Sequence, residues 1–104
     1  MKILHIIAGA EQGGAESCAV DTMKALHSAG IEQTVICRPH IAFLTLVKDC
    51  AIDHHILSFN RALKWPQKAR INAIIKNEKP DLVHCWLNRA ASFTPYQKKI
   101  PVLG

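Results

Sequence analysis

Long apolar runs and a cysteine framework are both missing from this sequence of 104 residues. The longest apolar stretches, such as residues 41–47, are much shorter than the roughly 20 residues of a membrane-spanning helix, and the first residues lack the length and cleavage site of a signal peptide. The four cysteines form no C-x-x-C pair, a spacing that fits neither a zinc module nor a disulfide framework. We therefore predict a soluble, unexported protein with reduced cysteines and no metal site.

Aromatic residues are also scarce, at 6% of the chain, and they do not alternate with basic residues as in many nucleic-acid-binding modules. No helix-turn-helix or RNA-binding signature is present, so no nucleic-acid partner is expected. The charge, in contrast, is divided unevenly. Residues 1–59 carry four Lys or Arg against six Asp or Glu, whereas residues 60–104 carry nine against two. The basic half of the chain needs a physical explanation.

Two explanations fit this basic half. Clustered cations can hold the phosphates of a nucleotide or of an anionic membrane, and an aromatic ring among them suits a lipid interface. The candidate membrane or anion patch consists of Lys64, Trp65, Lys68 and Arg70. Charge runs of this kind also occur on ordinary solvated helix faces, so the sequence alone leaves both explanations open.

The periodicity of apolar residues predicts strands that alternate with helices. Continuous or alternating apolar runs predict strands at residues 2–8, 31–37, 52–57, 81–86 and 100–103. Spacings of three and four residues predict helices at residues 15–29, 41–48, 66–79 and 88–96. Gly30 is the expected cap of the first helix, and Pro66 belongs to the first turn of the third. His5 and the cysteines lie within apolar patterns, so we expect them to be packed in the core.

This alternation, without a hairpin dipeptide such as Asn-Gly, predicts right-handed β-α-β units in one parallel sheet. The expected fold is an α/β, Rossmann-like sheet of strand order 3-2-1-4-5 with helices on both faces. Such a sheet binds ligands beyond the carboxyl ends of its strands, at the switch point that here lies between the first and fourth strands. The candidate site residues are therefore those that follow these two strands.

Two segments meet at this switch point. Gly13 and Gly14 would let backbone N–H groups at a helix start face an anion, with Glu16 in the first turn. The other segment offers an aromatic face, an amide and a guanidinium, from Trp86, Asn88 and Arg89. The glycines spell neither the dinucleotide fingerprint nor a P-loop. Ordinary structural roles also fit these residues: a tight turn, a first-turn acid, ring packing and a helix cap.

Four motifs, taken in order, resemble a known family. M-K-I-L-x-I forms the first strand, G-G-A-E opens the first helix, K-P-D-L-V-H ends in the fourth strand, and I-P-V lies at the fifth. Together they are similar to the N-terminal domain of glycosyltransferase family 4, over the whole chain. The resemblance implies the GT-B fold and a retaining enzyme without a further cofactor. Such an enzyme moves a sugar from a nucleotide-sugar donor to a lipopolysaccharide, polysaccharide or glycolipid acceptor.

The same resemblance implies roles for individual residues. Gly13 and Gly14 match the glycine loop that faces the donor diphosphate, and Glu16 matches the acid of that motif. Residues 84–89, which include His84, would line the acceptor side of the cleft. The sequence departs from the family at Trp86, where many members have a second histidine. The basic helix would attach the protein peripherally to the inner face of the cytoplasmic membrane.

The resemblance implies that residues 1–104 form a single acceptor-side domain. The family's C-terminal donor-binding domain has no counterpart in this sequence. We therefore expect a truncated, cytoplasmic domain that is inactive alone, because retaining transfer needs both halves around a closed cleft. One alternative is a stand-alone Rossmann-like binding module that forms an oligomer through an exposed sheet edge. Another is a module that binds a free mononucleotide at Gly13 and Gly14.

Overall fold

The fold is known from a computed structural model, which describes residues 1–7, 14–38, 52–86, 93–95 and 100–103 and gives only the backbone of residues 14–18 and 61. The strands are β1 (Lys2–Ile7), β2 (Glu32–Cys37), β3 (Asp53–Ile56), β4 (Leu82–Trp86) and β5 (Val102–Leu103). The helices are α1 (Gly14–Ser28), the short 3-10 helix η1 (Arg61–Leu63) and α3 (Lys64–Glu78). The helix predicted at residues 41–48 and most of the one at residues 88–96 lie outside the described residues.

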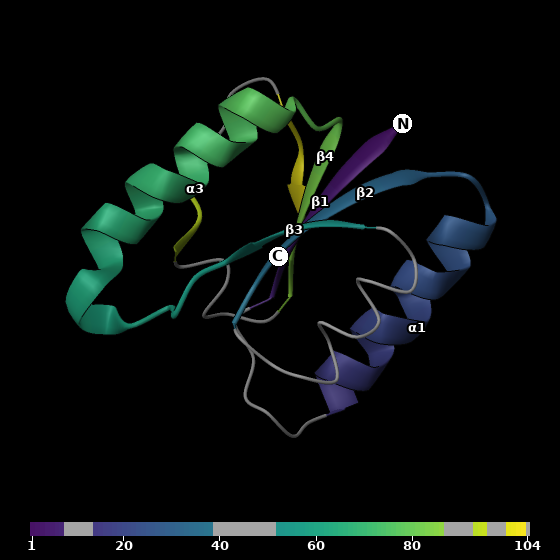
Figure 1. The fold of residues 1–104 in the computed structure, drawn as a ribbon, viewed down its shortest axis with the longest axis horizontal. Helices are drawn as coiled ribbons and strands as arrows, with labels where there is room; N and C mark the ends of the chain where they lie inside the picture. Colours follow the sequence, from purple (N-terminus) through teal and green to yellow (C-terminus); the bar gives the residue numbers. More distant parts are fainter. Residues whose placement is uncertain (8–13, 39–51, 87–92, 96–99, 104) are drawn as a thin grey trace.

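The strands form one parallel sheet of order β3-β2-β1-β4-β5. This confirms the predicted topology, including the switch point between β1 and β4. The chain leaves β1 toward β2 through α1 and reaches β4 from β3 through α3, so right-handed connections place these helices on opposite faces. Figure 1 shows the two helices on either side of the sheet.

The core is divided by the sheet into two apolar layers. On the α3 face, Leu4 and Ile6 of β1 pack in one cluster with Ile71 of α3. On the α1 face, Ile7 of β1 packs in a second cluster with Met23 of α1. Burial of each such side chain contributes roughly 1.5–3 kcal/mol of stability. Because both faces of β1 are covered, its residues form the nearly continuous apolar run that the sequence shows.

Two of the four cysteines lie in the described part of the core. Cys37 and Cys85 are both buried, which confirms their expected role as small apolar side chains. Burial raises the pKa of the Cys37 thiol to about 11 and also raises the pKa of Cys85. Cys18 and Cys50 lie outside the described side chains.

The two long helices end in the same left-handed conformation but with different residues. Gly30 has φ of 79°, and its N–H donates to the carbonyl of His27 while the Ile31 N–H donates to that of Leu26. This pair of bonds is a Schellman motif, as the predicted glycine cap requires. At the end of α3 the corresponding position is Lys79, with φ of 51°, where a residue with a Cβ atom is strained.

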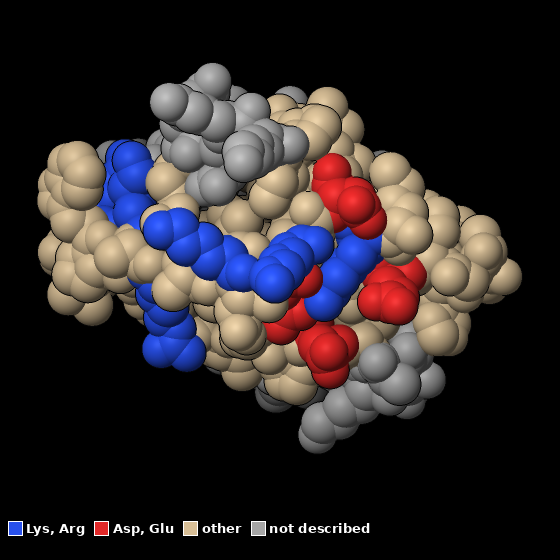
Figure 2. Space-filling view, turned by 90° about the horizontal axis from the view of Figure 1, so that it is seen from above, with Lys and Arg blue, Asp and Glu red and all other residues tan. Residues whose placement is uncertain are grey.

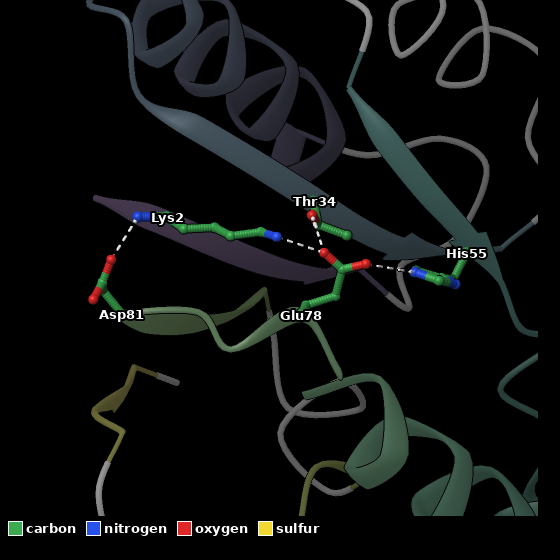
Figure 3. A network of polar contacts seen from close by, with 5 residues as sticks. All are labelled: Lys2, Thr34, His55, Glu78 and Asp81. Atoms are coloured by element: carbon green, nitrogen blue, oxygen red, sulfur yellow. Dashed lines mark hydrogen bonds and ion pairs between the residues drawn. The ribbon is translucent and has the colours of Figure 1, made fainter. Parts of the chain in front are cut away.

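A polar network ties the amino ends of the strands to the end of α3. The Lys2 ammonium lies 2.6 Å from the Glu78 carboxylate, which also accepts a hydrogen bond from Thr34 and lies 3.5 Å from the His55 ring (Figure 3). The hydrogen bond to Glu78 raises the pKa of Lys2, and the same bond lowers the pKa of Glu78. Lys2 and Asp81 are joined as well, because the Asp81 N–H donates to the Lys2 carbonyl and the Lys2 N–H donates to the Asp81 carboxylate. Lys2 and Glu78 are therefore paired within the chain.

Candidate functional site

The candidate site lies at the carboxyl ends of the strands, opposite the polar network of Lys2 and Glu78. β1 ends at Ile7 and β4 ends at Trp86, and these two residues are register partners. Helix α1 begins at Gly14, one residue before its predicted start, and Glu16 lies in its first turn. Gly13 lies outside the described residues, and the side chain of Glu16 is not described either.

The end of β4 presents two aromatic side chains on one face of the sheet. His84 and Trp86 are two residues apart in a strand, so both point toward the α1 face. Their rings are stacked, with centroids 4.3 Å apart and an interplanar angle of 29°. Both side chains are half-buried. The structure thus brings together two of the four residues predicted on the acceptor side, while Asn88 and Arg89 lie outside the described residues.

A series of buried hydrogen bonds connects this aromatic pair to β1, β2 and α1. His5 in β1 is the register partner of His84 and has no solvent exposure. Its Nδ1 lies 3.2 Å from the Trp86 indole nitrogen, and its Nε2 lies 2.8 Å from Gln33 Oε1. The Gln33 amide nitrogen donates in turn to the carbonyl of Met23 in α1, at 2.9 Å. The prediction that His5 is a packed core histidine is therefore confirmed.

The electrostatics of this region favour neutral rings. Burial lowers the pKa of His5 to about 4, against a smaller opposing effect of the hydrogen bond with Gln33. Burial also lowers the pKa of His84. Both imidazoles are therefore uncharged near pH 7, and the aromatic pair suits the binding of an uncharged ring. Within the described segments no three His, Cys, Asp or Glu side chains gather where they could hold a metal ion.

His5 and Gln33 are the supporting residues that the sequence analysis did not assign to the site. A usable signal was present for His5, which is a polar residue within the apolar strand β1, because a buried polar group requires a partner, whereas Gln33 follows Glu32 and precedes Thr34 and gives no such signal. The partners themselves could not be named from the sequence. They depend on which strands are neighbours and in which register.

The candidate basic patch lies at the start of α3, which follows the carboxyl end of β3. Trp65 is 78% exposed, and the Lys68 ammonium lies 5.1 Å from the centroid of its ring. Lys64 lies 5.5 Å from the ring of Phe93, and Arg70 is exposed. The first turn of α3 holds no acidic residue. Figure 2 shows Lys and Arg side chains in a row that ends beside a group of Asp and Glu side chains.

These features define the class of protein. A parallel sheet of order 3-2-1-4-5, with a glycine pair at the first helix, has the architecture of a Rossmann-like domain. The family model of Glycosyltransferase Family 4 matches residues 12–104. The chain belongs to this family, and its sheet is the Rossmann-like N-terminal half of the GT-B fold.

Two curated relatives come from Rhizobium meliloti (strain 1021). The lipopolysaccharide core biosynthesis glycosyltransferase LpsD is 34% identical over 104 residues, which cover 95% of this chain and 29% of LpsD. The glycosyltransferase LpsE, of the same description, is 36% identical over 111 residues, which cover 100% of this chain and 32% of LpsE. The chain therefore spans about a third of the length of these relatives.

Solved structures share the fold. A glycosyltransferase from Rickettsia africae ESF-5 superposes with a TM-score of 0.72 at 20% identity, over 97% of this chain and 28% of that one. Alr3699/HepE from Anabaena, in complex with UDP, superposes with a TM-score of 0.59 at 23% identity, over 86% of this chain and 24% of that one. At this identity the likeness concerns the fold alone.

Proposed function

We propose that this chain is the acceptor-side domain of a retaining glycosyltransferase that extends a lipopolysaccharide, polysaccharide or glycolipid acceptor. The observation that carries the proposal is the similarity to LpsD and LpsE, two lipopolysaccharide core biosynthesis glycosyltransferases, at 34% and 36% identity over nearly the whole chain. The switch-point geometry supports it, because the aromatic pair and the start of α1 lie at the edge where such sheets bind ligands.

The donor in this proposal is a nucleotide sugar. The backbone N–H groups at Gly13 and Gly14 would face its diphosphate, aided by the dipole of α1, and Glu16 would lie beside them. The likeness to HepE structures that contain UDP, and UDP with glucose, supports a donor of this class. We further propose that catalysis needs residues beyond these 104, because a retaining transfer requires a closed cleft that excludes water.

The acceptor side in this proposal consists of His84, Trp86, Asn88 and Arg89. A direct test is NMR titration of the 104-residue chain with deacylated lipopolysaccharide core oligosaccharide. We expect shifts at the Trp86 indole N–H and the His84 ring, and none at the Lys2 and Asp81 amides of the opposite edge. If 10 mM oligosaccharide, about ten times a weak dissociation constant of 1 mM, moves no signal of the β4 end, the acceptor assignment is wrong.

A cytoplasmic location with peripheral membrane contact completes the proposal. No helix among the described residues is long and apolar enough to cross a bilayer. The exposed Trp65 beside Lys64, Lys68 and Arg70 has the composition of an interfacial contact with anionic lipid. In vesicle sedimentation, Lys68→Glu should weaken binding to anionic vesicles. Lys24→Glu makes an equal charge change at an exposed position of α1 and should leave the binding unchanged. Equal binding of both variants would contradict the membrane contact.

The alternative is a binding module that assembles through its sheet edge. The outermost strand β5 favours it, because Val102 and Leu103 are 40% and 52% exposed. Sedimentation equilibrium distinguishes the two functions. A concentration-independent monomer that binds the oligosaccharide supports the acceptor-side domain, and a stable oligomer without saccharide binding supports the module.

A further inference from the structure

The hydrogen-bond chain beneath the aromatic pair has only one consistent direction. An indole nitrogen can only donate, so the Trp86 N–H donates to His5 Nδ1, which must carry no proton. The proton of the neutral ring is therefore on Nε2 and is donated to Gln33 Oε1. The Gln33 amide nitrogen then donates to the Met23 carbonyl. Every bond of the chain is thereby accounted for.

This series of hydrogen bonds connects the Trp86 ring to the backbone of α1 through the buried side chains of His5 and Gln33. Trp86 is the last residue of β4, and without the bond its indole could turn about two side-chain torsions. The bond to His5 fixes the edge of the indole, and the face of the indole carries the His84 ring at 4.3 Å. Trp86 also packs against the apolar cluster on the α1 face, and the bond to His5 Nδ1 is the directional contact that fixes the rotation of its ring.

We propose that His5 is the positioning residue of the acceptor site: it holds Trp86 so that the His84–Trp86 stack presents a fixed aromatic surface to a sugar ring of the acceptor. The inference rests on the proposed function for its ligand, but the positioning itself rests on the hydrogen-bond geometry alone.

The chemistry of the stack favours a sugar over an anion. An aromatic face is negative, and the face of a sugar ring that carries axial C–H bonds is apolar and weakly positive. Both imidazoles are neutral near pH 7, and His84 retains ring nitrogens for hydroxyl groups. A ring that is already fixed also loses less conformational entropy when a ligand binds.

Two amide variants separate positioning from general core packing. His5→Asn keeps an acceptor near the place of Nδ1 and can still bind Trp86, whereas His5→Gln keeps a donor near the place of Nε2 and can bind only Gln33. Both lose the same imidazole. A Trp65→Phe background leaves Trp86 as the single indole of the chain, so its N–H signal is unambiguous.

The readouts are the hydrogen-exchange rate of the Trp86 indole N–H and the affinity for deacylated core oligosaccharide, both by NMR. We expect His5→Asn to resemble the parent, and His5→Gln to exchange about tenfold faster and bind about tenfold more weakly, as expected for one lost hydrogen bond. Equal behaviour of the two variants would overturn the positioning role. A protected indole in a chain that binds no oligosaccharide would leave that role intact and refute the proposed function at this site.

An acid titration of the unmutated chain gives a test that needs no variant to fold. A proton added to His5 enters at Nδ1 and removes the acceptor of Trp86, so the indole signal should move with a midpoint near the His5 pKa of about 4. The packed elements contribute His84 from β4 as a further titratable group that acts on His5, while Gln33 and Met23 do not ionise. An indole signal that stays constant while His5 titrates in the folded chain would contradict the inference.

Discussion

His5 should make the folded chain lose stability in mild acid. Its pKa is lowered by burial from an ordinary 6.5 to about 4, so between these values the unfolded chain binds a proton that the folded chain does not. Stability must then fall as the pH falls. The contribution of His5 is complete above pH 6.5, decreases through the window from 6.5 to about 4, and stops changing below it.

The magnitude follows from the two pKa values. Their difference corresponds to about 3 kcal/mol over the whole window, at about 1.4 kcal/mol for each pH unit. Between pH 7 and pH 5 the expected loss is about 2 kcal/mol, because most of the unfolded population is protonated at pH 5 while the folded ring is still neutral. A loss of this size is a large part of the stability of a small domain.

Urea denaturation at pH 7 and pH 5 measures this loss, with His5→Asn as the control. His84 and Glu78 also have lowered pKa values and contribute in the same direction, His84 below its ordinary 6.5 and Glu78 below its ordinary 4.5. Both groups are present in the variant, so the difference between the two proteins isolates His5. The reasoning is refuted if the variant loses as much stability between pH 7 and pH 5 as the unmutated chain.

Three further predictions concern the helix ends and the charged network. Gly30→Ala should destabilise the fold by about 1 kcal/mol in urea denaturation through backbone strain alone, because nothing lies within 4 Å of the added Cβ. Lys79→Gly should stabilise it by about 0.5 kcal/mol in the same assay, and a loss of stability would contradict the strain at φ of 51°. Glu78→Gln should cost about 1 kcal/mol and reduce the salt dependence of the thermal midpoint, since it breaks the ion pair with Lys2. An unchanged salt dependence would show that the pair contributes nothing.

Most of the fold could be predicted from the sequence because its elements differ in period. Both long helices and all five strands lie where apolar spacing places them, and the absence of hairpin turns indicates a parallel sheet. The ends of elements were less certain. Residue Pro66 was placed in the first turn of its helix, which is confirmed, but α3 already begins at Lys64 and follows the 3-10 turn Arg61–Leu63. The first-turn N–H groups have no partner within the helix, so Pro is tolerated at any of these positions and does not fix the first residue.

The site was less predictable than the fold because its contacts cross between strands. The two-residue period already places His84 and Trp86 on one face of β4. The partnership of Trp86 with His5 requires that β1 and β4 be neighbours and that His5 pair with His84. Gln33 reaches His5 only because the register of β2 pairs Gln33 with Ile3. Ile3 is two residues before His5 in β1, so both lie on the same face of the sheet. A shift of one residue in either register would turn these side chains to the opposite face of the sheet.

The two edges of the sheet use polar side chains in different ways, and this difference supports the site proposed at the carboxyl edge. At the amino edge, Lys2 and Glu78 are paired with each other and bonded to their neighbours, so a ligand that binds these two side chains would have to displace contacts that already stabilise the fold. At the carboxyl edge, His5 is satisfied within the core, and the exposed part of the site is a neutral ring pair with no carboxylate bound to it in the described segments. A ligand that stacks on this pair need not break any hydrogen bond between the described residues. The buried histidine can therefore stabilise the geometry of the site while the rings that it positions remain available for an acceptor.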